Sequence, residues 1–392
     1  HKDLRLMTSQ VTAILVVHDG ASWLPQVVAA IASQSRAPDR TLAVDTGSVD
    51  GSAKLLSGAK IKCISTGRGE GFGTAISEAV ATLPPCESDD EWLWLLHDDS
   101  APDLRALEKL LEAVSDRPNI AMVGPKILGW HDRTHLLEVG ISIARNGARW
   151  TGLEEFEYDQ GQHDGIREVL SVSTAGALIR RSVFEELGGF DEKLDLFRDD
   201  VDFGWRIHTA GQSVLVNTDA VIYHAQAASS ERRTVDVDEA FLHRPHLLDR
   251  RNAAYVLLAN STWWMLPLIS IQIIGAALFR AVGYLFAKLP GYASDELLAL
   301  ARLFIRPDLV RAGRKWRKED RLVSPRVVTK FMPSRWLQIR SAIDAISDLI
   351  QAKLFPVQNQ IANDITEDED LLTPVKRRNW MDLLKRPDLL SF

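Results

Sequence analysis

An apolar run that ends in three polar residues constrains this chain more than any other segment. Residues 93–96 are all apolar, and His97, Asp98 and Asp99 follow directly. Such a run is typical of a strand that is buried on both faces inside a parallel sheet. Two adjacent carboxylates at its end repel each other unless a cation or several donors compensate them. Because ligands of open α/β sheets bind beyond the carboxyl ends of the strands, we expect a metal and a phosphorylated ligand here.

A helix start is the alternative explanation of the same residues. Asp99 or Ser100 would then be the N-cap, and Pro102 would lie in the first turn of a helix from Leu104 to Val114. The two explanations are compatible, since one residue can cap a helix while its neighbour binds a cation.

Strands and helices alternate on both sides of this run. This alternation predicts βαβ units, and therefore an α/β fold with a mostly parallel sheet flanked by helices. Later in the chain, less regular sequence precedes a further strand, an acidic helix and two short strands. The expected strands are 11–17, 41–44, 61–65, 92–96, 172–180, 213–216 and 220–224, and the expected helices include 23–33, 74–83, 183–187 and 199–210.

The overall composition limits the class of protein. A chain of 392 residues is long enough for two domains, or for one large domain with an appendage. A formal net charge of −7 argues against a nucleic-acid-binding protein. Cys63 and Cys86 are too few for a disulfide framework or a cysteine-based zinc site, which fits a reducing, cytosolic setting.

A long uncharged segment indicates contact with a membrane. Residues 252–279 contain no Asp, Glu, Lys or Arg, and this length could span a bilayer. A basic tract, 301–340, follows and carries 12 Lys and Arg against 3 Asp and Glu. A single crossing would place this tract on the opposite side from Arg250 and Arg251, against the positive-inside tendency. We therefore expect a hairpin, 253–289, that re-enters the bilayer or lies in its interface; a buried hairpin of a soluble domain is the alternative.

Alternating glycines form a second candidate ligand loop. Residues 67–73 place a glycine at every second position, with Arg68 and Phe72 among the residues between them. The spacing is not that of a dinucleotide-binding fingerprint. The loop nevertheless allows close approach of the backbone to a phosphate before a helix start, and Arg68 could pair with a diphosphate. A flexible connection without a ligand is the alternative.

The order of the motifs resembles the inverting family-2 glycosyltransferases of GT-A fold. Among these it is nearest to actinobacterial members related to galactofuranosyl- and rhamnosyltransferases, over roughly residues 10–226. The resemblance rests on His18-Asp19-Gly20, the segment from Val44 to Ser52, the segment from Gly71 to Ala75, His97-Asp98-Asp99, the segments 174–177 and 188–191, the acidic segment from Asp199 to Arg206, and the segment from Ala220 to His224.

The resemblance implies a site for a sugar nucleotide and a divalent metal. Asp99 matches the last acid of the Asp-x-Asp motif, and His224 matches a histidine that completes the metal site in some relatives. His97 replaces the first acid of that motif and is a third candidate ligand. Oxygen ligands suit Mg²⁺ or Mn²⁺, and a second imidazole favours Mn²⁺. The nucleotide-binding residues implied are His18, Asp19, Asp45, Arg68, Gly71, Phe72, Gly73 and Asp98.

The resemblance also assigns the residues on the acceptor side. Asp200 matches the general base that takes the proton of the acceptor hydroxyl, and Asp199 is its rival for that role. Gly176 and Ala177 would leave room for the donor sugar or the acceptor. Trp205 would stack on the face of a sugar.

Together these features predict a metal-dependent, inverting glycosyltransferase at the cytoplasmic face of the plasma membrane. It would move a sugar from a UDP- or dTDP-sugar to a hydroxyl of a lipid-linked or cell-envelope glycan. A catalytically inactive sugar-nucleotide binding protein or scaffold of the same fold is the alternative, and no oligomeric state is predicted. The expected organisation is a glycosyltransferase domain at 10–235 with halves 10–125 and 126–235, a helical region at 236–355, and an acidic linker and tail at 356–392.

Overall fold

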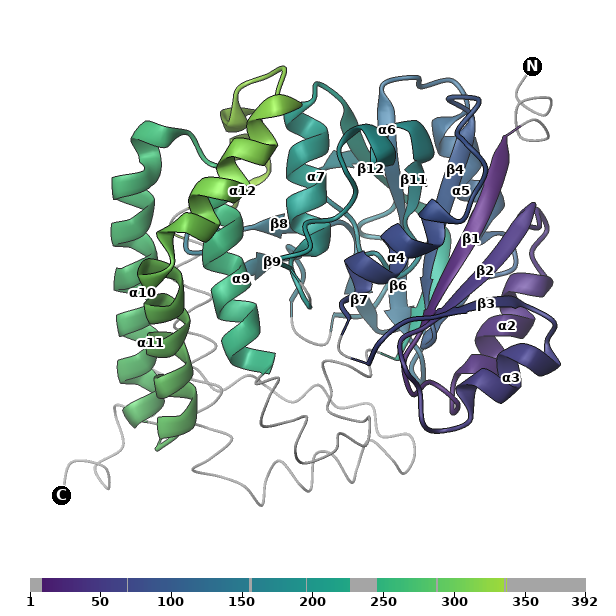
Figure 1. Ribbon diagram of the computed structural model, residues 1–392, viewed down its shortest axis with the longest axis horizontal. Helices are drawn as coiled ribbons and strands as arrows, with labels where there is room; N and C mark the ends of the chain where they lie inside the picture. Colours follow the sequence, from purple (N-terminus) through teal and green to yellow (C-terminus); the bar gives the residue numbers. More distant parts are fainter. Residues whose placement is uncertain are drawn as a thin grey trace.

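A mixed ten-stranded sheet lies at the centre of the protein (Figure 1). The computed structural model describes residues 9–68, 70–154, 157–194, 196–225, 245–286, 288–334 and 336. Along the sheet the strand order is β10-β12-β6-β11-β4-β1-β2-β3, while β5 pairs with β12 and β7 pairs with β6. The strands are β1 Gln10–Val17, β2 Arg40–Asp45, β3 Lys62–Ser65, β4 Glu91–His97, β5 Ser100–Pro102, β6 Ile120–Gly129, β7 Leu136–Glu138, β10 Ile166–Val169, β11 Leu178–Arg180 and β12 Ser213–His224.

The prediction of an α/β fold is confirmed, and the sheet is parallel in its larger part. Strands β1, β2, β3, β4, β6 and β12 point in one direction, and β5, β7, β10 and β11 oppose them. A separate small hairpin is formed by β8 Ser142–Ile143 and β9 Arg149–Trp150.

Helices cover both faces of the sheet, as the apolar strands require. One face packs against α2 Leu24–Ala32, α3 Ser52–Gly58 and α5 Ala106–Val114. The other face packs against α4 Phe72–Ala81, α6 Arg181–Glu186 and α7 Asp199–Thr209. Strand β4 is buried from Trp92 to Leu96, which explains why its sequence is a continuous apolar run rather than an alternating one.

The turn after β4 leads into another strand and not into a helix. Strand β5 begins at Ser100 and pairs with the end of β12, where Ser100 lies opposite His224. Helix α5 begins only at Ala106, so the alternative of a helix N-cap at Asp99 or Ser100 is wrong. The pairing with β12 instead brings the residues after β4 next to a strand more than 100 positions later in the chain.

Other boundaries differ from the prediction in limited ways. Strand β6 was not predicted, and the predicted strand 172–180 is a strand only at Leu178–Arg180. The two short strands expected between residues 213 and 224 form one strand, β12, whose pairing with β6 is irregular between Asn217 and Val221. The end of the expected helical region, 337–355, and the tail 356–392 lie outside the described residues.

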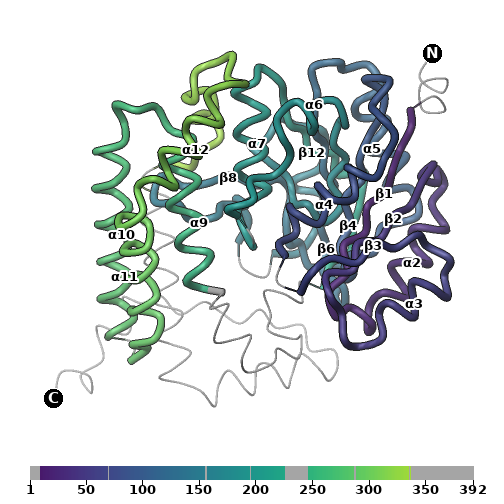
Figure 2. Tube along the Cα trace, in the orientation of Figure 1, coloured from purple at the N-terminus to yellow at the C-terminus, as the bar shows by residue number. Residues whose placement is uncertain are grey.

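Among the described residues, four helices follow the sheet and stand beside it (Figures 1 and 2). They are α9 Pro245–Asn260, α10 Leu266–Phe286, α11 Pro290–Ile305 and α12 Pro307–Glu319, with the short 3-10 turns η1 Trp263–Met265 between α9 and α10 and η2 Pro325–Phe331 after α12. Residues 253–259 of α9 are all buried, and they share an apolar core with α7 and the β8–β9 hairpin. The expectation of membrane contact therefore applies to α10 and not to α9.

Helix α10 exposes one apolar face along its whole length. Its buried residues lie three or four positions apart from Ile269 to Tyr284, while Ile271 is 68 % exposed and Phe286 is 80 % exposed. Of the described residues, one helical segment, Trp263–Phe286, is long and apolar enough to cross a membrane.

Candidate active site

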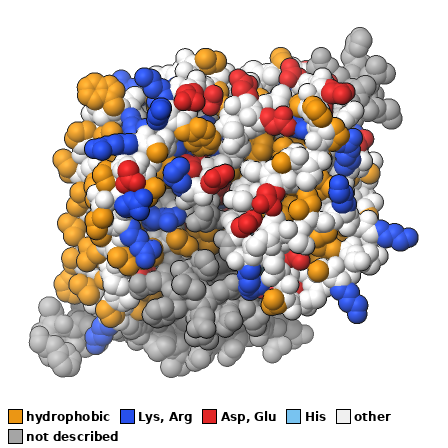
Figure 3. Space-filling view, viewed as in Figure 1, with side chains coloured by type: hydrophobic (Ala, Val, Ile, Leu, Met, Phe, Trp, Pro, Cys, Tyr) orange, Lys and Arg blue, Asp and Glu red, His pale blue; other side chains and the backbone are white. Residues whose placement is uncertain are grey.

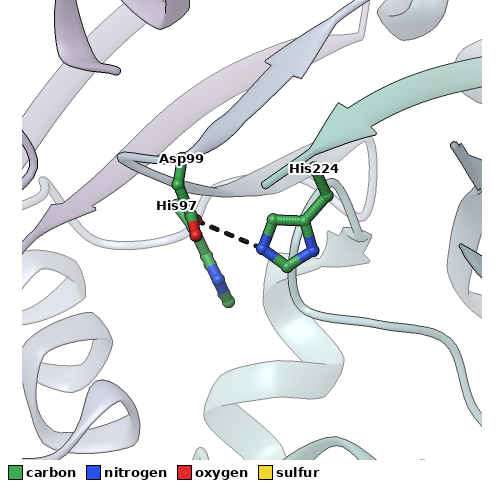
Figure 4. A group of neighbouring side chains, drawn as sticks. All are labelled: His97, Asp99 and His224. Carbon is green, nitrogen blue, oxygen red and sulfur yellow. Dashed lines mark hydrogen bonds and ion pairs between the residues drawn. The ribbon is translucent and has the colours of Figure 1, made fainter. Parts of the chain in front are cut away.

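Three predicted metal ligands lie together beyond the ends of β4 and β12. His97 ends β4, Asp99 lies in the turn before β5, and His224 ends β12 (Figure 4). Their ligand atoms all lie within 4.8 Å of one another. The Nε2 atom of His224 is 3.2 Å from the Oδ1 atom of Asp99. The sequence placed these residues in two separate motifs, and the β5–β12 pairing brings the motifs together.

The donor set fits a divalent cation. Ligand atoms about 2.1 Å from an octahedral ion are roughly 3 Å apart when they are adjacent, close to the Asp99–His224 distance. Among the described residues, none lies within hydrogen-bond distance of the buried Nδ1 atom of His224. Two imidazoles and one carboxylate favour Mn²⁺ over Mg²⁺, since Mg²⁺ prefers oxygen ligands.

The protonation of His224 depends on the surrounding carboxylates. Burial acts to lower its pKa, but Asp99, and to a lesser extent Glu138 and Asp98, outweigh burial, so the pKa of His224 is raised. A proton on this imidazole therefore occupies the place that a metal ion would take. His97 is held differently: its Nε2 atom is 3.1 Å from the hydroxyl of Thr174, and its ring lies 4.7 Å from the ring of Phe72.

The loops after β1 and β2 bring together several of the predicted nucleotide-binding residues. The Arg68 guanidinium lies 2.8 Å from the Asp19 carboxylate, which also accepts a hydrogen bond from the backbone N–H of Val49. Arg68 and Val49 lower the pKa of Asp19, although burial acts in the opposite direction. The Nδ1 atom of His18 lies 2.8 Å from the hydroxyl of Thr46. These contacts connect the first loop, the second loop and the glycine-rich loop.

Two buried carboxylates fix the backbone of these loops. Asp45 is 5 % exposed and accepts a hydrogen bond from the N–H of Ser48. Asp98 is 1 % exposed and accepts a 2.7 Å hydrogen bond from the N–H of His18. A Cβ atom on Gly20 would lie 2.2 Å from the Oδ2 atom of Asp98, so this position must be glycine.

The glycine-rich loop leads into α4 beside the metal-ligand group. Gly71 is the N-cap of this helix, and Phe72, its first residue, contacts His97. A Cβ atom on Gly73 would lie 2.7 Å from the Cβ atom of Phe190, so Gly73 permits the close packing of two segments that the motif list separates.

The acidic segment begins α7 and faces the β8–β9 hairpin. Asp199 and Asp200 lie in the first turn, where the helix dipole stabilises negative charge. The Arg149 guanidinium, from β9, donates 2.8 Å hydrogen bonds to Asp200 and to Glu138. Asp200 therefore has a cationic partner in this structure.

Asp199 has a raised pKa. Burial and the neighbouring Asp200 carboxylate raise the pKa of Asp199 to about 7, although Arg149 acts in the opposite direction. A carboxylate with a pKa near the working pH is well suited to accept a proton. The structure thus keeps Asp199 and Asp200 side by side but gives them different electrostatic environments.

Three residues that were predicted to contact a sugar are buried in the structure. Trp205 is 2 % exposed and packs in the core shared with α9, so neither ring face is available to a sugar. A Cβ atom on Gly176 would lie 2.7 Å from Ile222, so the packing of β12 requires this glycine. Ala177 is fully buried in the sheet. The pattern resembled a sugar site because small and aromatic residues serve cores and binding sites alike.

Arginine partners of the motif acids were missed by the sequence analysis. Arg149 lies in the irregular segment after β7, and Arg317 lies in the basic tract, where it contacts Asp191 and Asp202. Neither arginine belongs to a motif. The basic composition of the tract was the only signal that could have pointed to Arg317.

Comparison with known proteins identifies the family of this chain. The model of a family described as glycosyltransferase like family 2 matches residues 9–236, more than half of the chain. The chain belongs to glycosyltransferase-like family 2. One relative of this family-2 member is the N-acetylglucosaminyl-diphospho-decaprenol L-rhamnosyltransferase of Mycobacterium tuberculosis, 26% identical over 284 residues that cover 67% of this chain and 89% of that protein. Another is the galactofuranosyltransferase GlfT1 of Mycolicibacterium smegmatis, 26% identical over 207 residues that cover 52% of this chain and 67% of that protein.

The fold of this glycosyltransferase is that of a solved structure. It is similar to GalNAc-T7, whose crystal structure contains UDP, GalNAc and Mn²⁺, with a TM-score of 0.51 and 14% sequence identity. The match covers 85% of this chain and 57% of GalNAc-T7. This likeness confirms the GT-A fold that the motifs predict. The helices α9, α10, α11 and α12 lie beyond the end of the family match.

Proposed function

We propose that this protein is a metal-dependent, inverting glycosyltransferase that acts on a lipid-linked or cell-envelope glycan. The donor is a UDP- or dTDP-sugar. The observation that carries the proposal is the placement of His97, Asp99 and His224 at the same edge of the sheet as the loops of His18 and Asp45. Its two mycobacterial relatives are named for the transfer of rhamnose and galactofuranose, and one name includes a decaprenol-linked acceptor.

The residues divide the chemistry between two sides. The nucleotide side is formed by the loops after β1, β2 and β4, the glycine-rich loop and the start of α4. Its residues are His18, Asp19, Asp45, Asp98, Arg68, Gly71, Phe72 and Gly73. A Mn²⁺ or Mg²⁺ ion held by Asp99, His224 and His97 would stabilise the charge of the departing diphosphate. On the other side, Asp200 takes the proton of the acceptor hydroxyl. At the same time the oxygen of that hydroxyl forms a bond to the anomeric carbon of the donor sugar. The bond from that carbon to the diphosphate breaks, and inversion follows from attack on the opposite face.

The assignment of the base rests on two neighbouring carboxylates, and Arg149 distinguishes them. Asp200 matches the motif position and is oriented by its 2.8 Å contact with Arg149. Asp199 is the rival because its raised pKa makes it the stronger proton acceptor. Acceptor binding beside the β8–β9 hairpin would have to weaken the Arg149–Asp200 contact for Asp200 to act as the base.

Substitution of each carboxylate tests this assignment. A donor is first chosen as the UDP- or dTDP-sugar that most raises the thermal midpoint of the wild-type protein in Mn²⁺. Asp200→Asn should lower transfer about 10²–10⁴-fold, as loss of a general base does, while donor binding in calorimetry stays unchanged. Asp199→Asn is the matched control. The reverse pattern would assign the base to Asp199, and wild-type protein that releases no nucleotide with any acceptor would favour the non-catalytic alternative.

We also propose that the enzyme docks on the cytoplasmic face of the membrane through α10 and α11. Exposed apolar side chains follow the edge that these two helices form, and basic side chains lie beside them (Figure 3). The exposed apolar residues include Ile271, Leu278, Phe279, Val282, Leu285 and Phe286 on α10, and Leu297, Phe304 and Ile305 on α11. Exposed cations nearby in the sequence are Arg302, Arg306, Arg311, Lys315 and Lys318.

The packing of α10 favours a position in the plane of the membrane. Its 21 residues extend about 31 Å, which equals the thickness of a bilayer core. However, a buried stripe from Ile269 to Tyr284 runs along the whole helix, which packs against α9 and α11. Because protein covers one side of α10 throughout, we favour a position in the interface, with the other side of the helix in lipid, over a membrane crossing.

Vesicle flotation tests the docking surface. The wild-type protein should float with vesicles that contain anionic phosphatidylglycerol. The double variant Ile271→Asp/Leu278→Asp should remain in the dense fraction with an unchanged thermal midpoint, because both side chains are exposed. Leu104→Asp changes an exposed leucine beside α5 and should float normally. Equal flotation of all three proteins would refute this surface.

A further inference from the structure

A buried arginine from α12 connects the two sides of the candidate site. The Arg317 side chain is 1 % exposed. Its Nη2 atom lies 2.7 Å from the Asp191 carboxylate and 2.7 Å from the Asp202 carboxylate, and its Nε atom lies 3.1 Å from the same Asp202 oxygen. Both acids belong to the family motifs, whereas Arg317 lies 81 residues after the end of the family match.

Asp202 links this arginine to the acidic turn of α7. It is fully buried on the same helix as Asp199 and Asp200. Besides Arg317, it accepts hydrogen bonds from Arg206 at 2.9 Å and from Asn260 at 2.6 Å. A planar guanidinium that bonds through two nitrogens fixes orientation as well as distance. The contact therefore restrains the N-terminal turn of α7.

Asp191 links the same arginine to the metal-ligand side. It directly follows Phe190, whose Cβ atom occupies the space that a side chain on Gly73 would need. The Phe190 ring lies 6.1 Å from the ring of Phe72, which in turn contacts His97. Asp191 also accepts a 2.7 Å hydrogen bond from the hydroxyl of Tyr255 on α9. A short chain of packed residues thus leads from Arg317 to His97.

The surrounding contacts show that α12 is fitted to the motif segments. The Arg206 guanidinium lies 4.6 Å from the centre of the Trp316 ring, and a Cβ atom on Gly188 would lie 3.1 Å from that ring. Arg206 also donates hydrogen bonds to the carbonyl groups of Leu187 and Gly189. Trp316 and Arg317 therefore complete the packing of two motifs that lie far earlier in the chain.

We propose that Arg317 is a positioning residue for sugar transfer. It sets the distance between the acidic turn of α7 and the Phe190 segment, and through them the distance between the base and the metal-bound diphosphate. The inference rests on the proposed function for its catalytic consequence. It also makes α12 part of the catalytic unit, although the composition of the basic tract suggested a separate region.

Arg314 provides a matched control on the same helix. Its guanidinium bonds to the carbonyl groups of Leu258 and Ser261 on the α9 side and contacts neither motif acid in any described hydrogen bond. Arg314→Gln therefore loosens α12 without changing Asp191 or Asp202. Arg317→Gln and Arg317→Lys change the contacts with both Asp191 and Asp202. Asp191→Asn weakens only the first of these contacts, and Arg317 still contacts Asp202.

The experiment compares turnover, donor binding and amide exchange in these four variants. Turnover is the release of nucleotide in Mn²⁺ from the sugar nucleotide that most stabilises the wild type, below every thermal midpoint. We expect Arg317→Gln and Asp191→Asn to lower kcat at least tenfold with the donor KM within threefold, and Arg317→Lys to recover part of the loss. Amide exchange should increase in both 188–191 and α7 for Arg317→Gln, but not for Arg314→Gln.

The outcomes separate this inference from the proposed function. If the wild type releases no nucleotide, the proposed function fails, and exchange still tests whether Arg317 connects 188–191 with α7. If Arg317→Gln does not fold, Asp191→Asn decides the result. The inference is overturned if the wild type is active and the turnover of Asp191→Asn or of Arg317→Gln equals that of Arg314→Gln.

Discussion

Asp99, at the end of β4, is paired with an imidazole, whereas Asp200 and Asp202, on α7, are paired with guanidinium groups. A histidine can lose its proton near neutral pH, and an arginine cannot. The partner of Asp99 can therefore become neutral and share the carboxylate with a metal ion. The partners of the α7 acids keep their charge at every physiological pH.

This difference separates two sides of the site. On the exchangeable side, at Asp99, the partner can lose its proton; on the fixed side, at Asp200 and Asp202, the partners cannot. On the Asp99 side, binding is coupled to proton release and should respond strongly to pH and to metal. On the α7 side, the charges of Asp200 and Asp202 contribute to the architecture and should respond mainly to substitution. The following predictions test this division, beginning with the largest expected effect.

Substitution of Asp202 should destabilise the whole domain. Asp202→Asn leaves Arg206 and Arg317 buried with less compensation, which costs about 3–5 kcal/mol of unfolding free energy. Denaturant unfolding of Asp308→Asn, which removes an exposed ion pair, should show almost no change in stability. Arg317 and Arg206 lower the pKa of Asp202 against the effect of burial, so its contribution is present above the normal pKa and is lost as the pH falls. Equal stability of the two variants would show that the α7 side is not fixed in this way.

Substitution of Asp99 should remove metal-dependent binding and leave the fold intact. Asp99→Asn removes the one carboxylate of the ligand group. Loss of a group that only supports a metal ligand already lowers metal affinity about 10- to 100-fold. We therefore expect the affinity for UDP in the presence of Mn²⁺ to fall by more than about 100-fold. Calorimetry measures it, with Asp103→Asn as the control in the segment after β5. Unchanged affinity would exclude Asp99 as a ligand.

Metal affinity should increase with pH. The pKa of His224 is raised, so at pH values below it the proton must leave before the metal binds. Affinity for Mn²⁺ should therefore rise by up to about tenfold per pH unit below that pKa and level off above it. Titrations in two buffers of different ionisation enthalpy would measure the released proton. Affinity that does not change between pH 6 and pH 8 would contradict the exchangeable Asp99 side.

Removal of Arg149 should have the smallest effect, a change in the pH profile. Arg149 acts to lower the pKa of Asp199, which burial and Asp200 raise. In Arg149→Gln this pKa should rise further, so the acidic limb of the kcat profile should move to higher pH if Asp199, the rival base, takes the proton. Arg145→Gln, from the neighbouring turn, is the control. A profile identical to that of the wild type would show that Asp199 does not limit turnover.

The sequence was sufficient for most of the strand–helix order, because the patterns of strands and helices are local, but it did not predict β5 and β6. An apolar run predicts a buried strand that ends at His97 and Asp99, and the family resemblance added His224 to the same predicted group. The partners of the α7 acids could not. Arg149 and Arg317 lie 51 and 115 residues from the acids they contact, in segments without a motif.

Hydropathy also failed to separate two neighbouring helices. Residues 252–279 form one uncharged run, yet α9 is a core helix and α10 has an exposed apolar face. Burial depends on what packs against a helix: residues 253–259 of α9 are enclosed in a core that includes α7 and the β8–β9 hairpin, whereas α10 keeps an exposed face. Trp205 shows the same limitation. A tryptophan ring can stack on a sugar, but this one lies in the core between α7 and α9.

The position of Arg317 also bears on how the protein is made. A ribosome adds about 5–20 residues per second, so the 81 residues from the end of the family match to Arg317 require roughly 4–16 s. During that interval the nascent chain contains Asp191 and Asp202 without their shared cation. The motif segments that contain Asp191 and Asp202 therefore reach their final packing only after α12, which is synthesised later, supplies Arg317.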